Sequence, residues 1–284
     1  SEAYEDGLRS DLQELALGRS DADLFGVASL DRFEGAPPGS GPADYLPGVR
    51  SVIVLGMRIP EGVMDVAGRY DEPGKTMGPY MWYGYVVPNW DLSSAAARVA
   101  KALERAGFKG LPFPPTGLNY KFGSRADFSH RHAAVAAGLG EFGLSALVLT
   151  PEFGAWQRFV SILTDAPLRP TPLYDGPSLC RPGDCEQACI TSCPTQALAG
   201  RVTVTVAGRR FGYARTDTVR CRWPFAEEGF RRTKLTLPDD AGEEEFRRLV
   251  RSTPLHPHDA DLSQFTFVPQ CGACMFRCPS PHFT

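Results

Sequence analysis

The chain has 284 residues, of which 43% are hydrophobic, 22% charged and 11% aromatic, and its formal net charge is −3 at pH 7. This composition is typical of a soluble globular protein and excludes disordered chains and fibrous repeats. The small net charge also argues against a protein whose whole exterior binds nucleic acid or a membrane surface. The longest strongly apolar run, residues 51–57, is too short to span a membrane, and residues 1–10 lack the apolar core of a secretory signal. The sequence therefore predicts a cytoplasmic protein without a membrane span.

The first part of the chain alternates helical and strand-like patterns. Three stretches have the apolar spacing or the end signals of an α-helix: residues 8–15, 91–107 and 127–137. Four others are short and apolar, as buried strands are: residues 24–30, 49–57, 146–150 and 157–164. The clearest helix is the second, because Asp91 can cap its start and Gly107 adopts the left-handed conformation that ends a helix.

A proline-rich stretch, residues 167–177, separates this part from the rest, and all eight cysteines follow it. Beyond it, residues 201–215 predict a hairpin that turns at residues 207–208, and residues 242–251 predict a short helix. The sequence therefore predicts an α+β fold with two domains, residues 1–170 and residues 171–284.

The cysteines form two runs and one single residue. The first run has the pattern C-x4-C-x3-C-x3-C-P, the second has C-x2-C-x3-C-P, and Cys221 lies alone between them. The end of each run matches the bacterial ferredoxin pattern, in which three closely spaced thiolates hold one iron–sulfur cluster and the cysteine before proline reaches the other. The spacing therefore predicts two [4Fe-4S] clusters with crossed ligation.

Each predicted cluster has four cysteine ligands. The first thiol set is Cys180, Cys185, Cys189 and Cys278, and the second thiol set is Cys193, Cys221, Cys271 and Cys274. Structural zinc is a weaker alternative, because only Cys271 and Cys274 form the C-x2-C pair that zinc prefers. A disulfide framework fits poorly with a chain of this size that has no export signal.

Other segments offer further chemistry. The G-x-G-x-x-G of residues 138–143 follows a helix and precedes a strand, the reverse of a dinucleotide site, so we interpret it as a tight turn that a bulky cofactor can approach. Aromatic residues crowd residues 79–90, as in a core or in the wall of a pocket for a flat molecule. His130 and His132 lie on different sides of the predicted helix, so they cannot bind one metal ion together.

Three stretches resemble the corrinoid and iron–sulfur reductases, a family that includes the epoxyqueuosine reductases and the reductive dehalogenases. They are residues 45–57, residues 132–168 and the cysteine pattern with the RCRW around Cys221. The resemblance implies a nitroreductase-like N-terminal domain that holds base-off cobalamin. It also implies a ferredoxin-like second domain with two [4Fe-4S] clusters, which receives electrons from an external donor such as ferredoxin or flavodoxin.

The residues and the resemblance together indicate the site. Candidate catalytic or pocket residues are Tyr80, Tyr83, Asn89, Tyr120, Lys121 and Arg125. Candidate contacts of the cofactor are His130, Gly138, Leu139, Gly140, Gly143, Thr150 and Phe153. By similarity, the second thiol set is expected to lie nearer the cobalt.

The chain also departs from both branches of the family. Asn89 stands where the epoxyqueuosine reductases place an acidic proton donor, and an amide does not readily deliver a proton. The sequence has neither the C-terminal helical repeats that help to grip tRNA nor a twin-arginine signal. We therefore expect a reductase of a small organic substrate rather than of a nucleic acid. The alternatives are an electron-transfer protein without corrinoid and a reductase with flavin in its first domain.

Overall fold

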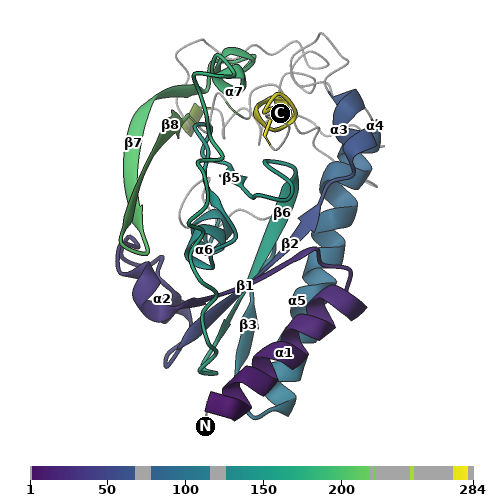
Figure 1. Ribbon diagram of the computed structural model, residues 1–284, viewed down its shortest axis with the longest axis vertical. Helices are drawn as coiled ribbons and strands as arrows, with labels where there is room; N and C mark the ends of the chain where they lie inside the picture. Colours follow the sequence, from purple (N-terminus) through teal and green to yellow (C-terminus); the bar gives the residue numbers. More distant parts are fainter. Residues whose placement is uncertain are drawn as a thin grey trace.

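A four-stranded antiparallel sheet forms the centre of the protein (Figure 1). The computed structural model describes residues 2–67, 78–115, 126–217, 221, 244–245 and 271–280. The strand order is β1-β2-β6-β3, with bounds Leu24–Ser29 for β1, Ser51–Arg58 for β2, Gln157–Thr164 for β6 and Gly110–Pro112 for β3. The predicted strands at residues 24–30, 49–57 and 157–164 are thus confirmed.

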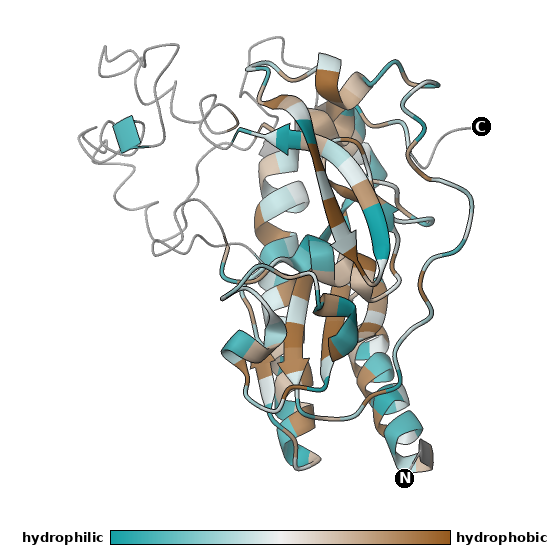
Figure 2. Ribbon diagram, turned by 90° about the vertical axis from the view of Figure 1, so that its left-hand side faces the viewer, coloured by the Kyte–Doolittle hydropathy of each residue, from teal (hydrophilic) through white to brown (hydrophobic). Residues whose placement is uncertain are grey.

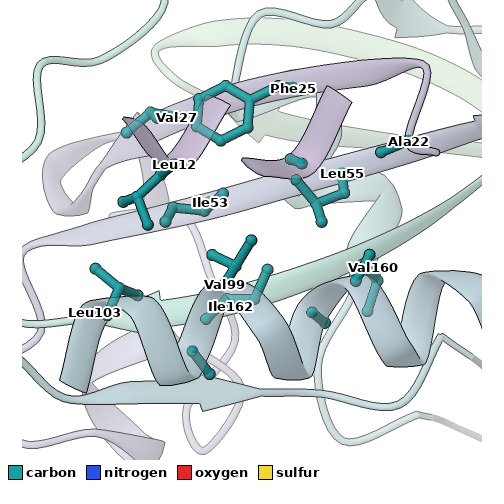
Figure 3. Close-up of a cluster of buried hydrophobic side chains, with 14 of the residues drawn as sticks. Leu12, Ala22, Phe25, Val27, Ile53, Leu55, Val99, Leu103, Val160 and Ile162 are labelled. Atoms are coloured by element: carbon teal, nitrogen blue, oxygen red, sulfur yellow. The ribbon is translucent and has the colours of Figure 1, made fainter. Parts of the chain in front are cut away.

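Helices cover both faces of this sheet. The long helices α1 (Glu2–Arg19) and α5 (Val87–Arg105) pack on one face, and α6 (His130–Ala136) packs on the other (Figure 1). The two-residue period of a strand explains this layering. In β2, Ile53 and Leu55 belong to the core beneath the long helices, whereas Val52 belongs to the core beneath α6. Figure 3 shows the first core, where side chains from α1, β1, β2, α5 and β6 meet.

The remaining helices are short, and a small second sheet lies among them. They are the 3-10 helix η1 (Leu30–Phe33), α2 (Pro42–Tyr45), α3 (Glu61–Ala67), α4 (Gly78–Met81), the π-helix η2 (Trp82–Val86), α7 (Ala188–Thr191) and α11 (Ala273–Phe276). The two strands β4 (Glu141–Phe142) and β5 (Val148–Leu149) pair with each other. Among the described residues, Cys189 lies on the single helical turn α7 and Cys274 on the single turn α11.

A two-stranded hairpin, β7 (Leu198–Val206) and β8 (Arg209–Thr216), confirms the hairpin predicted at residues 201–215. Its turn residues Ala207 and Gly208 both have positive φ, 50° and 73°, as a tight type I′ hairpin turn requires. Figure 2 shows mixed polar and apolar colouring along this hairpin and mainly apolar colouring along the central strands. The hairpin packs on the α6 side of the sheet, where Val206 is buried and Ala207 N donates to the Arg32 carbonyl at 3.1 Å.

Two predicted helices begin elsewhere than expected. The helix expected to start at Asp91 starts at Val87, because η2 leads directly into α5 and no capping residue is needed there. It ends as predicted, before Gly107 with φ 87°. The helix expected over residues 127–137 starts at His130, since the Ser129 hydroxyl caps it. The helix expected over residues 242–251 lies outside the described residues, except for residues 244–245.

The segment over residues 167–177 has no helix or strand, as expected for a connection. It is nevertheless fixed in place, because Thr171 N donates to the Val27 carbonyl at 2.9 Å and the Val27 N–H donates to the Thr171 hydroxyl at 3.0 Å. The division into two domains at this segment stays a prediction. Among the helices of the described residues, none has both the length and the hydrophobicity to cross a membrane.

The close approach of α6 to β1 depends on Gly26. A Cβ atom at this position would lie 2.7 Å from the Ala137 carbonyl oxygen, so Gly26→Ala must push the helix and the strand apart. We expect this substitution to lower the free energy of unfolding by about 1–3 kcal/mol, as overpacking does. Urea denaturation measures the change.

Gly62→Ala in α3 is the matched control. No atom lies within 4 Å of the added Cβ, so this variant is expected to gain about 0.4–1 kcal/mol from reduced chain entropy in the unfolded state. Equal stability of the two variants would contradict the role given to Gly26.

Candidate functional site

The cysteines of the first thiol set surround one pocket. Cys180, Cys185, Cys189 and Cys278 all line it, although Cys278 is far from the others in sequence. The rest of the lining comes from the turn between β4 and β5 and from residues beside the cysteines: Gly143, Leu144, Ser145, Leu149, Leu179, Arg181, Pro182, Gln187 and Pro279. All eight cysteines of the chain are free thiols. The fold therefore gathers the first set around a mainly apolar space.

Burial and neighbouring thiols act on the sulfur atoms of this set. Burial first, and then the neighbouring Cys189, Cys180 and Cys185, raise the pKa of Cys278 to about 11, opposed by a main-chain hydrogen bond at Ser280. Burial also raises the pKa of Cys180, opposed by a hydrogen bond from the Leu144 N–H to its Sγ at 3.2 Å. The other three thiols are thus close enough to Cys278 to disfavour its ionisation.

The second thiol set is described by the electrostatic neighbours of Cys274. Burial raises the pKa of Cys274 to about 12, followed by the effects of Cys221, Cys271, Cys189 and Cys193. Its three predicted partners are therefore among its electrostatic neighbours. Cys189 belongs to the first set, so the two sets are adjacent. The Ala197 N–H donates to Cys193 Sγ at 3.2 Å, a second main-chain hydrogen bond to sulfur.

These features fit iron–sulfur clusters. Protonated thiols lose their protons when a metal binds, so a metal cluster relieves the unfavourable ionisation of buried cysteines. Main-chain N–H groups that point at cysteine sulfur are among the contacts by which proteins adjust such clusters. Within the described parts of the chain, no three His, Cys, Asp or Glu side chains are placed to share a single metal ion. A [4Fe-4S] cluster instead bonds each thiolate to a different iron atom. Metal binding by the eight cysteines stays a prediction.

Two of the candidate catalytic tyrosines differ in environment. Tyr80 is only 2% exposed, and it packs against α11, with its hydroxyl 4.0 Å from Met275 Sδ and its ring edge-to-face with Phe276. A side chain at Gly272 would collide with the Tyr80 ring and hydroxyl. Burial raises the pKa of Tyr80 well above its usual range, which makes it a poor proton donor in this state. Tyr83 on η2 is 56% exposed.

Asn89 has a structural partner that the sequence did not indicate. Its side chain is buried on α5, and its Oδ1 accepts a hydrogen bond of 2.6 Å from Nε of Arg158 on β6. The Arg158 guanidinium lies over the Tyr85 ring, 4.2 Å from its centre. A single charged residue in the strand QRFVSILT was the available signal for Arg158. Tyr120, Lys121 and Arg125 lie outside the described residues.

The candidate cofactor contacts in residues 138–143 pack against other parts of the chain. A Cβ atom at Gly138 would collide with the Pro172 carbonyl, and one at Gly140 would collide with the Leu149 carbonyl. At Gly143 it would meet the Leu149 side chain at 3.1 Å. Leu139 packs into the core beneath α6. These glycines allow close packing within the protein, and their role in cofactor binding stays a prediction.

The other candidate cofactor contacts also have partners within the chain. His130 Nε2 donates to the Pro114 carbonyl, and its Nδ1 accepts from Ser161 Oγ, both at 2.9 Å. Thr150 is fully buried, and its Oγ1 accepts from Phe153 N at 3.1 Å. The guanidinium of Arg58 lies over the Phe153 ring. Contacts within the chain are therefore enough to explain where these side chains lie, without a bound macrocycle.

Because Arg158 donates a hydrogen bond to Asn89, we expect loss of the Asn89 side chain to destabilise the folded protein even when no cofactor is bound. Asn89→Ala leaves the Arg158 Nε–H without its acceptor, so we expect the free energy of unfolding to fall by about 2 kcal/mol, as for a hydrogen bond to a charged group. Chemical denaturation of the protein without metal checks this value. Ser93→Ala on the same helix removes only a hydroxyl bonded to the Asn89 carbonyl and serves as the control. An equal loss in both variants would contradict the structural role of Asn89.

The lowered pKa of His132 predicts that the free energy of unfolding depends on pH. Burial and then Arg131 lower its pKa to about 4, below the value of about 6.5 for an unperturbed histidine. As the pH falls from about 6.5 to about 4, the unfolded chain gains a proton that the folded chain does not, so stability falls. Urea titrations at about pH 7.5 and about pH 5 should show a smaller loss for His132→Asn than for the unsubstituted protein. The same loss in both proteins would contradict this assignment.

The chain resembles epoxyqueuosine reductases in sequence, although no protein-family model matches it. It is 41% identical over 68 residues to the enzyme of Listeria monocytogenes, a match that covers 24% of this chain and 16% of the relative. It is 40% identical over 88 residues to the enzyme of Vibrio cholerae, covering 31% of this chain and 22% of the relative. The matched segments thus span less than a quarter of each curated relative.

Solved structures extend the likeness to the fold. Epoxyqueuosine reductase from Streptococcus thermophilus has a TM-score of 0.55 at 17% identity, covering 95% of this chain and 65% of that one. A reductive dehalogenase studied for B12-dependent dehalogenation has a TM-score of 0.56 at 17% identity, covering 93% of this chain and 36% of that one. The resemblance predicted from the sequence is confirmed. Over the matched segments the chain is similar in sequence to epoxyqueuosine reductases, and its α+β fold is similar to theirs and to that of a reductive dehalogenase.

Proposed function

We propose that this chain is an oxidoreductase that passes electrons through two [4Fe-4S] clusters to a base-off cobalamin, for reductive chemistry on a small organic substrate. The observation that carries the proposal is the gathering of the first thiol set around one pocket, with cysteines of the second set as neighbours. The likeness in fold to a reductive dehalogenase described as B12-dependent supports the corrinoid part.

The chain's own residues have defined tasks in this proposal. The first and second thiol sets would hold one cluster each, and the hydrogen bonds from Leu144 N and Ala197 N would stabilise negative charge on the sulfur atoms of Cys180 and Cys193. The apolar lining around the first set keeps water from the metal. When bound, the clusters would supply one-electron transfer and the corrinoid the reductive chemistry. A ferredoxin or flavodoxin is the proposed donor of electrons.

The two regions of the chain would divide the work. Residues 171–284 would form the cluster-holding, ferredoxin-like domain, and residues 1–170 the nitroreductase-like domain for the cofactor and substrate. Because the sequence relatives are epoxyqueuosine reductases, epoxyqueuosine in RNA is the second substrate to test. A small molecule remains the proposed substrate.

A second candidate function is an electron-transfer protein without an organic cofactor. The observation in its favour is that the described candidate cofactor contacts, including His130, Gly138 and Gly140, already have partners within the chain. A flavin in place of the corrinoid is the third outcome to distinguish.

Spectra of the reconstituted protein separate these functions. The protein is purified without oxygen, reconstituted with iron, sulfide and hydroxocobalamin, desalted and scanned in the visible region. We expect about eight irons per chain, as two cubanes require, and retained corrinoid bands. A broad iron–sulfur shoulder alone favours the electron-transfer protein, and a flavin spectrum in the protein as purified favours the third candidate. Protein without iron would overturn all three.

Removal of one ligand tests the thiol sets. Cys274→Ala is expected to lose one cluster, so that about four irons per chain remain after reconstitution. Ser192→Ala is the control, because Ser192 lies next to Cys193 and its buried hydroxyl has no hydrogen-bond partner in the described structure. An iron count unchanged by Cys274→Ala would refute the assignment of the second set.

A further inference from the structure

The turn between β4 and β5 lies against the first thiol set. Residues 143–145 of this turn line the same pocket as the four cysteines of the set. Both strands belong to the first part of the chain, whereas all eight cysteines belong to the second. One wall of the proposed cluster site therefore comes from a segment that contains no cysteine.

Contacts that do not involve the cysteines fix this turn. Within it, the Ala146 N–H donates to the Gly143 carbonyl at 2.9 Å. From α6, Arg131 Nη1 donates to the Ala146 carbonyl at 2.7 Å. From β8, the Ala214 N–H donates to the Leu144 carbonyl at 2.8 Å. These contacts can hold the turn in shape before any metal binds.

Glu141 on β4, at the start of the turn, is bonded to the segment that leads into Cys180. Its Oε1 accepts hydrogen bonds from Ser178 Oγ at 2.9 Å and from Leu179 N at 2.6 Å. The same oxygen accepts from Cys180 N at 3.2 Å. Hydrogen bonds to a carboxylate are stronger than those between neutral groups. Glu141 therefore fixes the main chain at the first cysteine of the set.

Two other residues of the turn donate to cysteine sulfur. The Leu144 N–H donates to Cys180 Sγ at 3.2 Å. Ser145 is buried and lines the pocket together with Cys189. Burial, and then the neighbouring thiols of Cys180 and Cys185, raise the pKa of Cys189. The Ser145 hydroxyl opposes this rise through a hydrogen bond to Cys189.

We propose that the turn between β4 and β5 positions two ligands of the first cluster, with Glu141 fixing the main chain at Cys180 and Ser145 donating to the sulfur of Cys189. Hydrogen bonds to sulfur are among the features that set the reduction potential of a cluster. A reduced cluster carries one more negative charge, so a donor at its sulfur favours the reduced form. This inference rests on the proposed first cluster and adds two positioning residues to it.

Thiol labelling of the metal-free protein tests the role of Glu141. Glu141→Ala and Glu141→Gln both remove the negative charge, but only Glu141→Ala removes the acceptor oxygen. We expect iodoacetamide to modify Cys180 about tenfold faster in Glu141→Ala than in Glu141→Gln, because the main chain at Cys180 loses its acceptor. Mass spectrometry of the labelled peptides measures the rate. Cys185, whose Sγ lies 4.0 Å from the Pro182 carbonyl, is the reference in the same sample.

The rates at Cys180 and Cys185 decide this test. Equal rates at Cys180 in the two folded variants would overturn the positioning role of Glu141. An increase at Cys185 as large as that at Cys180 would show a general loosening and would overturn the role as well. If Glu141→Ala does not fold, Ser178→Ala replaces it, since it removes only one donor to the carboxylate. An unchanged rate at Cys180 in Ser178→Ala would then overturn the role.

Redox titration of the reconstituted protein, followed by electron paramagnetic resonance, tests the role of Ser145. We expect Ser145→Ala to lower the ratio of reduced to oxidised first cluster at a fixed potential by about fivefold, as the loss of one hydrogen bond implies. Ser192→Ala is the matched control, because the buried Ser192 hydroxyl has no hydrogen-bond partner in the described structure. Cys274→Ala, expected to keep only the first cluster, identifies which reduction step belongs to it.

The remaining outcomes separate this proposal from the proposed function. An unchanged titration of the first cluster in Ser145→Ala, or an equal shift in Ser192→Ala, would overturn the role of Ser145 and leave the proposed function intact. A reconstituted protein without any reducible cluster would overturn the proposed function, and with it the role of Ser145. The labelling of the metal-free protein would still decide whether Glu141 fixes Cys180.

Discussion

The crowding of partly buried thiols is the constraint on which the arrangement around them depends. A cysteine taken out of water resists ionisation, and several cysteines held together resist it more, as the raised pKa values of Cys274 and Cys278 reflect. Ionised thiols in such an arrangement are unfavourable unless a positively charged group binds to them. The surrounding protein therefore has to hold the sulfur atoms in place by contacts that do not depend on them.

Those contacts come from the first part of the chain. Among the described residues, the segments around Cys189 and Cys274 have the single helical turns α7 and α11, which are too short to be stable alone. Glu141 holds the approach to Cys180, Trp156 Nε1 donates to the Met275 carbonyl at 3.2 Å, and Tyr80 packs over Gly272. The first part of the chain thus supports these described cysteine segments.

Much of the central fold could be predicted because its signals are local. In β2 every residue from Ser51 to Met57 is buried, and the turn at Ala207 and Gly208 identifies the hairpin. The start of α5 could not be predicted, since a π-helix continues into it and replaces the cap expected at Asp91. The same holds for contacts between distant segments: the bond from Arg158 to Asn89 and the packing of Gly138 against Pro172 depend on the assembled fold. The grouping of Cys180, Cys185, Cys189 and Cys278 around one pocket, in contrast, agrees with the set expected from their spacing, and cluster binding by them stays a prediction.

The connection over residues 167–177 has a consequence for the behaviour of the protein in solution. β1 is the outermost strand of its sheet, and such a strand offers unpaired main-chain groups to any other chain. Thr171 occupies both main-chain groups of Val27, and Arg32 holds the Thr171 carbonyl from the other side at 2.8 Å. The connecting segment thereby occupies the outward main-chain groups in the middle of β1, and this hinders intermolecular β-pairing along the margin of the sheet.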